Sequence, residues 1–171
     1  AAKLYELLSR AGFRRSHGLA YRPACPGCTA CVPVRIDAGA FRPDRSFRRI
    51  LKVNDNLIAE EVGAIATAEQ YRLFIHYQKA RHNDGEMSTM SFRDYRAMVE
   101  DSPIDTGLVE FRDGDGRLIG ALLADRQLDA LSAVYSFFDP DLKRRSLGTY
   151  MVLWLVERAC EASLPYVYLG Y

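Results

Sequence analysis

The sequence lacks the features that mark membrane, secreted and disordered proteins. None of its apolar runs approaches the ~20 residues that a helix needs to span a bilayer, and no signal peptide, low-complexity tract or internal repeat is visible. Of its 171 residues, 49% are hydrophobic and 26% are charged, which is ordinary for a soluble globular protein. We therefore expect one domain, or two closely packed parts, in a cytoplasmic protein with no membrane partner.

Groups for covalent catalysis are also scarce. The sequence holds three histidines, and no Ser–His–Asp set or Cys–His pair has a spacing that would indicate a nucleophilic catalytic site. The sequence therefore gives no sign of nucleophilic catalysis by such a set.

The net charge is +1, but the two parts of the chain differ in sign. Residues 1–55 carry 11 Lys and Arg against 4 Asp and Glu, whereas residues 56–171 carry 12 against 18. This split indicates either a polyanionic partner for the basic part or docking of that part on the acidic one. Because the chain starts at Ala1 without Met and stops at Tyr171 inside an apolar strand pattern, we expect it to be trimmed at both ends.

One stretch, residues 131–162, organises the rest of the chain. Residues 131–138 are rich in β-branched and aromatic side chains and predict a strand. The DPD sequence at 139–141 predicts a turn, because Pro fixes φ and Asp bonds its own backbone. From Ser146 onward the chain is apolar on most faces, which predicts a long helix packed on a sheet and covered on its other side.

The join between turn and helix is Lys143-Arg144-Arg145-Ser146-Leu147-Gly148. It places cations, a hydroxyl and a glycine where the first backbone N–H groups of the helix have no internal partner. Such a helix start is an anion site, and flanking arginines strengthen it. The alternative is a solvated basic turn that precedes a helix capped by Ser146. From physical chemistry alone the two interpretations stay open.

The amino-acid sequences of several segments resemble those of a known family. The strand, the DP turn, Arg145-Ser-Leu-Gly148 and the short strand at 166–169 resemble the acyl-binding core of the GNAT acyltransferases. YSFFDPDLKRRSLGTYM, YVYLGY and GFRRSHGLAYRPACPGCTACVPVRI look like the bacterial aminoacyl-tRNA–protein transferases. That group contains the leucyltransferases that act on N-terminal Asp and Glu, and it is related to the eukaryotic arginyltransferases.

The resemblance implies a mixed α/β fold, with a GNAT-like core at 56–171 and a smaller basic part at 1–55 that contains the cysteines. It implies transfer of leucine from leucyl-tRNA to an N-terminal Asp or Glu of a protein, which creates a degradation signal. No cofactor is required for that chemistry. Arginine is the sister option as donor. An acetyl-CoA-dependent GNAT enzyme and a metal- or nucleic-acid-binding module are the other hypotheses; the bulky Tyr150 at the third position of a CoA loop argues against the former.

The resemblance also implies roles for individual residues. Binding of the aminoacyl-tRNA 3′ end is assigned to the helix start, and the ester carbonyl is flanked by side chains of the strand before it. The catalytic candidates are Tyr135, Ser136 and Tyr168; the tRNA-binding candidates are Arg144, Arg145, Ser146, Leu147 and Gly148; the acceptor-binding candidates are Tyr21, Arg22, Arg35 and His82.

The cysteines form a second motif, Cys25-x-x-Cys28-x-x-Cys31. Thiols at this spacing can reach one centre, as zinc and iron–sulfur loops require. A complete site needs a fourth ligand, for which His17 and a residue outside the chain are options. The alternative is a set of reduced, buried cysteines that stabilise a tight Pro/Gly turn. A zinc or iron–sulfur centre at this loop stays open.

Two basic segments complete the candidates. Residues 32–36 predict a short buried strand whose one charge, Arg35, meets either an internal carboxylate such as Asp37 or the acidic side chain of the acceptor. Residues 42–52 predict a helix with Arg45, Arg48, Arg49 and Lys52 on one face. That face is either solvated or, in a family that uses tRNA, a contact for RNA phosphates.

The other segments predict alternating helices and strands. A helix is expected at 1–12, one strand at 13–21, a strand at 57–62, helices at 67–81 and 91–100, and an antiparallel meander at 106–111, 118–125 and 131–138.

Overall fold

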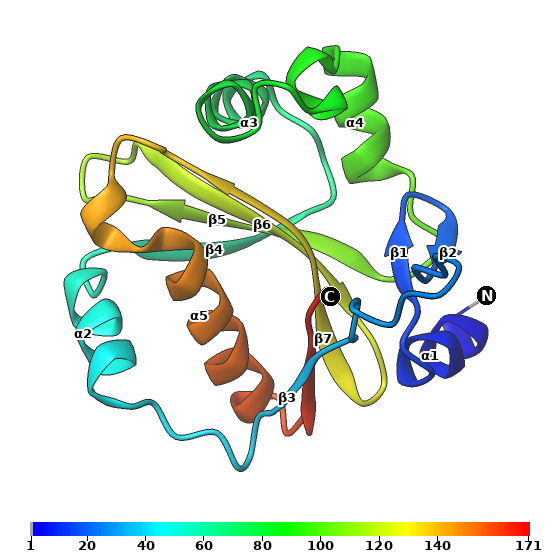
Figure 1. Cartoon of the computed structure of the whole chain (residues 1–171). Coiled ribbons are helices and arrows are strands. Elements are labelled where there is room, and N and C mark those ends of the chain that lie inside the picture. Colours follow the sequence, from blue (N-terminus) through cyan, green and yellow to red (C-terminus); the bar gives the residue numbers. More distant parts are fainter. Residues whose placement is uncertain (1) are drawn as a thin grey trace.

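The computed structural model describes residues 2–171 and has one central sheet between two layers of helices (Figure 1). The strand order in the sheet is β3-β8-β7-β6-β5-β4; β7 and β8 are parallel, and all other neighbours are antiparallel. The predicted mixed sheet is thereby confirmed. The strands of the sheet are β3 (Arg35–Asp37), β4 (Ile58–Gly63), β5 (Thr106–Arg112), β6 (Leu118–Arg126), β7 (Ala130–Phe138) and β8 (Tyr166–Tyr168).

Helices cover both faces of the sheet. In Figure 1, α3 and α4 lie on one face and α2 and α5 on the other. Thr67 and Ser91 cap α3 and α4, each in a capping box with the side chain three residues later. The helices are α1 (Ala2–Arg10), α2 (Arg45–Val53), α3 (Ala68–Arg81), α4 (Phe92–Glu100) and α5 (Leu147–Glu161), with short 3₁₀ turns η1 (Glu86–Thr89) and η2 (Lys143–Arg145).

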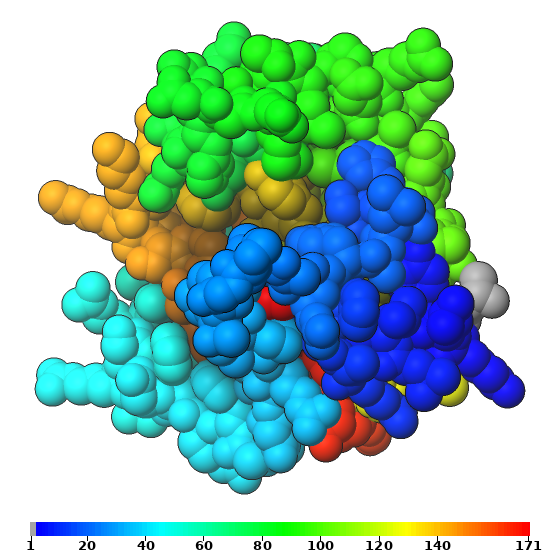
Figure 2. Space-filling view, turned by 45° about the vertical axis from the view of Figure 1, so that its right-hand side comes forward, coloured from blue at the N-terminus to red at the C-terminus, as the bar shows by residue number. Residues whose placement is uncertain are grey.

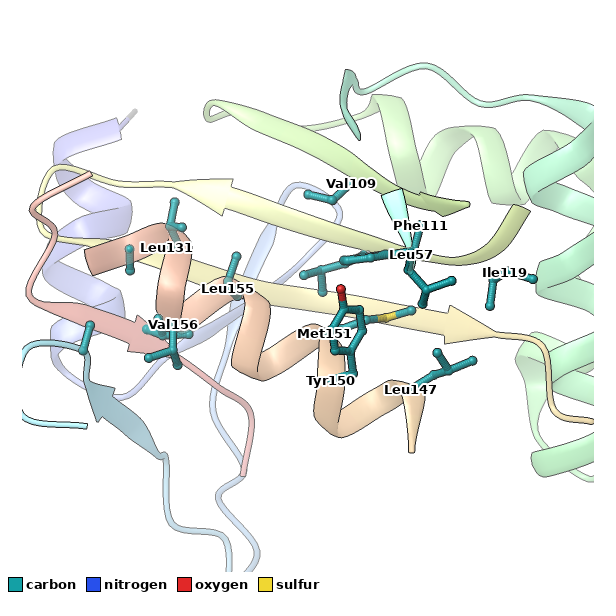
Figure 3. Close-up of a cluster of buried hydrophobic side chains, with 14 residues drawn as sticks. Leu57, Val109, Phe111, Ile119, Leu131, Leu147, Tyr150, Met151, Leu155 and Val156 are labelled. Atoms are coloured by element: carbon teal, nitrogen blue, oxygen red, sulfur yellow. The ribbon is translucent and has the colours of Figure 1, made fainter. Parts of the chain in front are cut away.

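The helix α5 forms the larger of two buried cores with the sheet (Figure 3). Met151, Leu155 and Ala159 are buried along one side of the helix and meet Val109 and Phe111 of the sheet. The second core lies between the sheet and α3 and α4. The apolar helix predicted from Ser146 onward is thus packed on the sheet, as expected. Within residues 2–171 no helix combines the length and the apolar character that crossing a membrane requires.

The prediction of one strand over residues 13–21 is wrong. The segment forms a hairpin of two short strands, β1 (Arg14–Ser16) and β2 (Leu19–Tyr21), which pair with each other. The chain reverses at His17-Gly18, where His17 adopts a positive φ of 53°. A histidine tolerates this left-handed conformation better than a β-branched residue does, but the pattern gave no turn signal of the Asn-Gly kind.

The prediction of a buried strand over residues 32–36 is also wrong. The strand in this segment, β3, begins only at Arg35. It lies at the edge of the sheet and pairs with β8 alone. Val32 and Val34 are 62% and 45% exposed, because the described chain places no further layer over this edge. The Leu169 N–H donates to the Val34 carbonyl oxygen (2.9 Å), and the Val34 N–H donates to the Gly170 carbonyl oxygen (3.1 Å), so backbone hydrogen bonds nevertheless continue before β3.

The division between residues 1–55 and 56–171 stays a prediction. The structure shows that the first part contributes β3 to the main sheet. It also shows that Ile50 and Leu51 of α2 pack on the core that α5 forms. Any boundary at residue 55 is therefore crossed by both hydrogen bonds and apolar contacts.

Candidate functional site

Among the described residues, β7 has an edge on its β8 side that is unpaired beyond Ser132, toward the start of α5. Its pairing with β8 covers only Ala130–Ser132, whereas its pairing with β6 continues to Phe138. The register between β6 and β7 shifts between Leu123 and Ala124, which leaves Val134 as an extra residue in β7. Such bulges redirect side chains next to functional sites. As a result Val134 and Tyr135, though adjacent, both pack on the side of α3 and α4.

The two candidates on β7 lie on opposite faces of the strand. The Tyr135 hydroxyl accepts a hydrogen bond from Gln78 Nε2 (2.5 Å), and burial raises the pKa of Tyr135. Ser136 is half-buried and, as the next residue in the strand, points toward the side of α5. The catalytic roles of both side chains stay predictions.

The start of α5 offers backbone N–H groups that no side chain of the described residues caps. Ser146 occupies the N-cap position as predicted, but it adopts a left-handed φ of 50° and its side chain makes no capping hydrogen bond. Gly148 lies so close to β7 that a Cβ there would be 3.2 Å from the ring of Phe138. Leu147 is buried in the core and anchors the turn.

The cations at this helix start are not neutralised by carboxylates. Among the described residues, Lys143, Arg144 and Arg145 form no ion pair; the Arg145 guanidinium donates only to the side-chain Oδ1 of Asn56, at 3.3 Å. A further cation, Arg81 at the end of α3, lies over the ring of Phe138 at 5.8 Å from its centre. The uncapped N–H groups therefore follow directly in the chain on three cationic residues that have no carboxylate partner among the described residues.

The carboxylates of Asp139 and Asp141, in the turn before α5, interact with other residues than the cations at the helix start. Asp139 is buried, pairs with Arg117 and accepts a hydrogen bond from the Asp141 backbone N–H at 2.9 Å. Asp141 approaches His76 Nε2 at 3.2 Å. The predicted DPD turn thus fixes its own backbone and leaves the anion site free.

Tyr168 lies on β8 beside β7, as predicted, and is 1% exposed. Its hydroxyl donates to Asp129 Oδ2 at 3.3 Å, and Arg14 lies over its ring at 5.3 Å. Burial, followed by the charge of Asp129, raises the pKa of Tyr168. The tyrosine is therefore held in its neutral form, and its part in proton transfer stays a prediction.

The candidates for acceptor binding do not form one cluster. Tyr21 is 46% exposed and lies 6.1 Å from the Tyr171 ring, and Arg22 lies over the ring of Phe13. Arg35 is exposed on β3 and stacks 4.1 Å from the centre of the Tyr166 ring. Among residues 2–171 it has no ion-pair partner, so of the two alternatives the structure does not form the internal salt bridge, and acceptor binding stays a prediction.

His82 lies apart from the other acceptor candidates. It ends α3 as the C-cap residue, and its ring is 5.7 Å from that of Tyr77. Tyr77 in turn packs against Phe138, with ring centres 4.8 Å apart. His82 is thus connected through Tyr77 to Phe138, the last residue of β7, and its role in acceptor binding stays a prediction.

The cysteine loop differs from the expected buried turn. Pro26 and Gly27 form a tight turn, in which the Cys28 N–H donates to the Cys25 carbonyl oxygen at 3.1 Å and Gly27 has a φ of 69°. All three thiols of the loop are exposed, because the loop lies on the surface outside both cores.

The structure does not gather these thiols around one point. In the part of the chain that it describes, the set of three potential ligands with atoms within 4.8 Å of one another is His76, Asp139 and Asp141. Metal binding by Cys25, Cys28 and Cys31 stays a prediction.

Sequence reasoning missed a cavity on the α4 side of β7. Its volume is about 640 Å³, and it is bounded by β7, η1, α4 and the β1–β2 hairpin. Val134 and Tyr135 form one wall, and Met87, Met90 and Met98 form another. In Figure 2 the yellow segment of β7 is recessed between the green helices and the blue N-terminal segments. The signal in the sequence was three methionines within twelve positions, close to the loop that contains His82.

Tyr150, at the third position of the sequence compared with a CoA loop, has its side chain elsewhere than expected. Tyr150 is 7% exposed and packs edge-on against Phe111 in the core. Its bulk therefore does not lie in front of the helix start, and the argument against CoA from its size is wrong.

Comparisons with known proteins agree with this geometry. The chain matches the family models described as arginine-tRNA-protein transferase, N terminus, over residues 1–49 and C terminus over residues 69–171. It is 66% identical to an aspartate/glutamate leucyltransferase of Paramagnetospirillum magneticum and 57% identical to one of Rhodospirillum rubrum. In both cases all of the chain aligns and spans 70% of the relative's length.

Solved structures show the same fold at low sequence identity. The structure of L-PGS from Bacillus licheniformis superposes with a TM-score of 0.60 at 9% identity, over 98% of this chain and 49% of that one. A tandem GNAT protein from the clavulanic acid biosynthesis pathway superposes with a TM-score of 0.51 at 12% identity, over 100% of this chain and 50% of that one. The expected GNAT-like core is thereby confirmed. The chain belongs to the arginine-tRNA–protein transferase family, and it is an aminoacyltransferase of the leucyltransferase branch of that family.

Proposed function

We propose that the chain moves leucine from leucyl-tRNA to the α-amine of proteins that begin with Asp or Glu, and so marks them for degradation. The observation that carries this proposal is the edge of β7 that is unpaired beyond Ser132 among the described residues, toward a helix start with unneutralised cations. The RNA 3′ end brings phosphates and an activated ester together. Gly148 and Phe138 are in contact, so a phosphate at the helix start places the attached ester along β7.

The reaction is an acyl transfer between two bound substrates. The acceptor nitrogen attacks the ester carbonyl carbon, a C–N amide bond forms, and the C–O bond to the ribose breaks. The amine loses a proton and the ribose oxygen gains one. An α-amine with a reference pKa of about 7.7–8.0 is partly neutral near pH 7, so positioning the amine against the ester carbonyl supplies most of the acceleration.

Each group of residues has a part in this scheme. Arg144, Arg145 and the N–H groups of Leu147 and Gly148 hold the terminal phosphates, because helix starts and guanidinium groups both bind phosphate. Ser146 adds its hydroxyl. Tyr135 and Ser136 flank the ester and can stabilise the oxyanion. Tyr168, Tyr21, Arg22, Arg35 and His82 serve the acceptor and the proton transfer.

The reaction needs no cofactor, and we place it in the cytoplasm. The three exposed thiols of the cysteine loop suit a reducing compartment, since exposed cysteines in an oxidising one form disulfides. The donor is an aminoacyl-tRNA, a substrate of protein synthesis, and we therefore place the reaction where proteins are made.

A substrate panel tests the proposal. The chain is incubated with a peptide that begins with Glu and with radiolabelled leucyl-tRNA, arginyl-tRNA or acetyl-CoA in turn. We expect label to reach the peptide from leucyl-tRNA and not from acetyl-CoA. Transfer from arginyl-tRNA at the same rate would contradict leucine as the donor, and transfer from acetyl-CoA alone would contradict the proposal as a whole.

A further inference from the structure

We infer that the cavity beside Val134 and Tyr135 holds the leucyl residue of the aminoacyl-tRNA, with its side chain on the methionine wall and its α-ammonium at the carboxylates of Glu86 and Asp94. This assignment rests on the proposed function, because it names the substrate group that the cavity takes. The alternative occupant is the acidic N-terminal residue of the acceptor protein.

The floor of the cavity suits a branched aliphatic side chain. Met98 is 7% exposed and belongs to the buried core, whereas Met87, Met90 and Val134 are half-buried at the cavity wall. Thioether side chains are unbranched and flexible, so they adapt to an apolar group that enters and leaves. A leucine side chain placed here would exchange water for apolar contacts on several sides.

The cavity offers little to an acidic side chain. Of the described side chains that line it, Arg15 is the one Lys or Arg. Its guanidinium is committed to Asp125 by two hydrogen bonds, of 2.7 and 2.8 Å, and the two side chains are 4% and 1% exposed. An Asp or Glu of the acceptor would therefore enter beside carboxylates and find no free permanent cation.

Two carboxylates at the cavity rim are available to a cation. Glu86 and Asp94 line the cavity, and within residues 2–171 neither forms an ion pair. Asp94 Oδ2 accepts hydrogen bonds from the Ser91 N–H (2.9 Å) and hydroxyl (2.7 Å), which leaves Oδ1 free. These hydrogen bonds lower the pKa of Asp94, so its carboxylate is ionised at neutral pH.

The distance along β7 between the cavity and the start of α5 fits one bound nucleotide. Tyr135 precedes Phe138 by three residues, which corresponds to about 10 Å along a strand. Phe138 contacts Gly148 at the start of α5. A 3′-terminal adenosine whose phosphate lies at that helix start would extend its aminoacyl group toward the bulge at Val134.

The first test alters the size of the apolar wall. A Met90→Ala, Val134→Ala double variant is compared with the wild-type chain on leucyl-tRNA and phenylalanyl-tRNA, with a Glu-initiated peptide as acceptor. We expect the ratio of kcat/KM for leucyl over phenylalanyl donors to fall at least tenfold, the scale on which pocket size discriminates. An Ile58→Ala variant on the exposed side of β4 serves as the matched control and should keep the wild-type ratio.

The second test removes the ammonium and the carboxylates in turn. The wild-type chain should prefer leucyl-tRNA over N-acetyl-leucyl-tRNA, which lacks the positive charge. In a Glu86→Gln, Asp94→Asn variant this preference should shrink toward one, while a Glu60→Gln variant on β4 keeps it. Because each result is a ratio for one protein, loss of folded material cancels out even though Asp94 also caps α4.

The outcomes separate this assignment from the proposed function. If the wild-type chain transfers leucine but neither ratio changes in the variants, the assignment is wrong and the proposed function stands. It is likewise wrong if the variants change the preference between Glu-initiated and Ala-initiated acceptor peptides. No transfer from leucyl-tRNA by the wild-type chain would overturn both.

Discussion

The side-chain amide of Asn54 donates hydrogen bonds to the carbonyl oxygens of Arg145 (2.8 Å) and Ile50 (2.9 Å). Asn54 is completely buried and ends α2. One side chain thereby joins the last turn of the basic helix to the cationic turn before α5. The position of Arg145 depends on this contact, since the η2 turn has no side-chain cap of its own.

Replacement of Asn54 by Ala should lower both stability and tRNA binding. Two buried carbonyl oxygens lose a donor, so we expect the free energy of unfolding to fall by about 1–3 kcal/mol and the KM for leucyl-tRNA to rise. Urea denaturation and transfer kinetics measure the two effects. Asn56→Ala is the matched control: Asn56 is exposed and reaches only the Arg145 guanidinium, so its loss should change stability by less than about 0.5 kcal/mol.

Replacement of Arg145 by Ala should weaken the binding of charged tRNA. A charge-assisted hydrogen bond contributes about 1.5–3 kcal/mol, so we expect the Kd for leucyl-tRNA to rise roughly ten- to a hundred-fold, and further when Arg144 is also replaced. Binding is measured with the acceptor peptide at saturation. Lys3→Ala, at the start of α1, should leave the Kd unchanged. An unaltered Kd in the Arg145 variant would remove the tRNA end from this turn.

The basic face of α2 should determine the salt dependence of tRNA binding. Arg45, Arg48, Arg49 and Lys52 are all exposed and share one face, as predicted, while Ile50 and Leu51 pack on the core. Neutralising the four cations to Gln should reduce the slope of log K against log salt concentration by about 3 to 4.

A control for that prediction exists on α4. Arg93 and Arg96 are exposed too, but they line a pocket together with Glu100 and Asp101. An Arg93→Gln, Arg96→Gln variant should therefore keep the wild-type slope. Equal slopes in the α2 and α4 variants would show that the α2 face is merely solvated.

Replacement of Arg35 by Ala should reduce the preference for acidic acceptors. The guanidinium is exposed, stacks on Tyr166 and has no carboxylate partner among the described residues, so it can receive an Asp or Glu side chain. We expect the ratio of kcat/KM for Glu-initiated over Gln-initiated peptides to fall, with leucyl-tRNA at saturation. A variant that retains the wild-type ratio would show that Arg35 does not select the acceptor.

Replacement of Asp125 by Asn should be strongly destabilising. The change leaves the buried Arg15 guanidinium without its charge partner, and breaking such a pair costs about 3–5 kcal/mol. The double variant Arg15→Met, Asp125→Leu should lose less, because no buried charge remains unpaired. Thermal and urea unfolding compare the three proteins; a double variant less stable than the single one would contradict the desolvation argument.

Much of the fold could be predicted because local patterns agree with it. The apolar helix from residue 147, the helices expected at 67–81 and 91–100 and the meander from Thr106 to Phe138 all matched the structure to within a residue or two. The errors lie in the hairpin at residues 14–21 and at the edge of the main sheet. The VPVRI segment is apolar enough for a buried strand, yet it ends up exposed because nothing in the described chain covers β3.

The candidate site was only partly visible in the sequence. The cations and the glycine at the start of α5 are adjacent in the chain, so spacing alone brought them together. The cavity was not visible, because its wall combines β7, η1, α4 and the β1–β2 hairpin. The bulge at Val134 leaves no pattern of its own, since it changes which face a side chain takes without changing composition.

By itself the sequence determined the cationic helix start, the layered α/β fold and the family, because each depends on residues that are close in the chain or on sequence segments that relatives share. The tertiary structure alone decided which charges stay free. Arg15 and Arg145 are both arginines in basic segments, but folding buries the first against Asp125 and leaves the second beside Asn56 without a carboxylate. Charge neutralisation depends on contacts between residues distant in sequence, and only the packed chain establishes them.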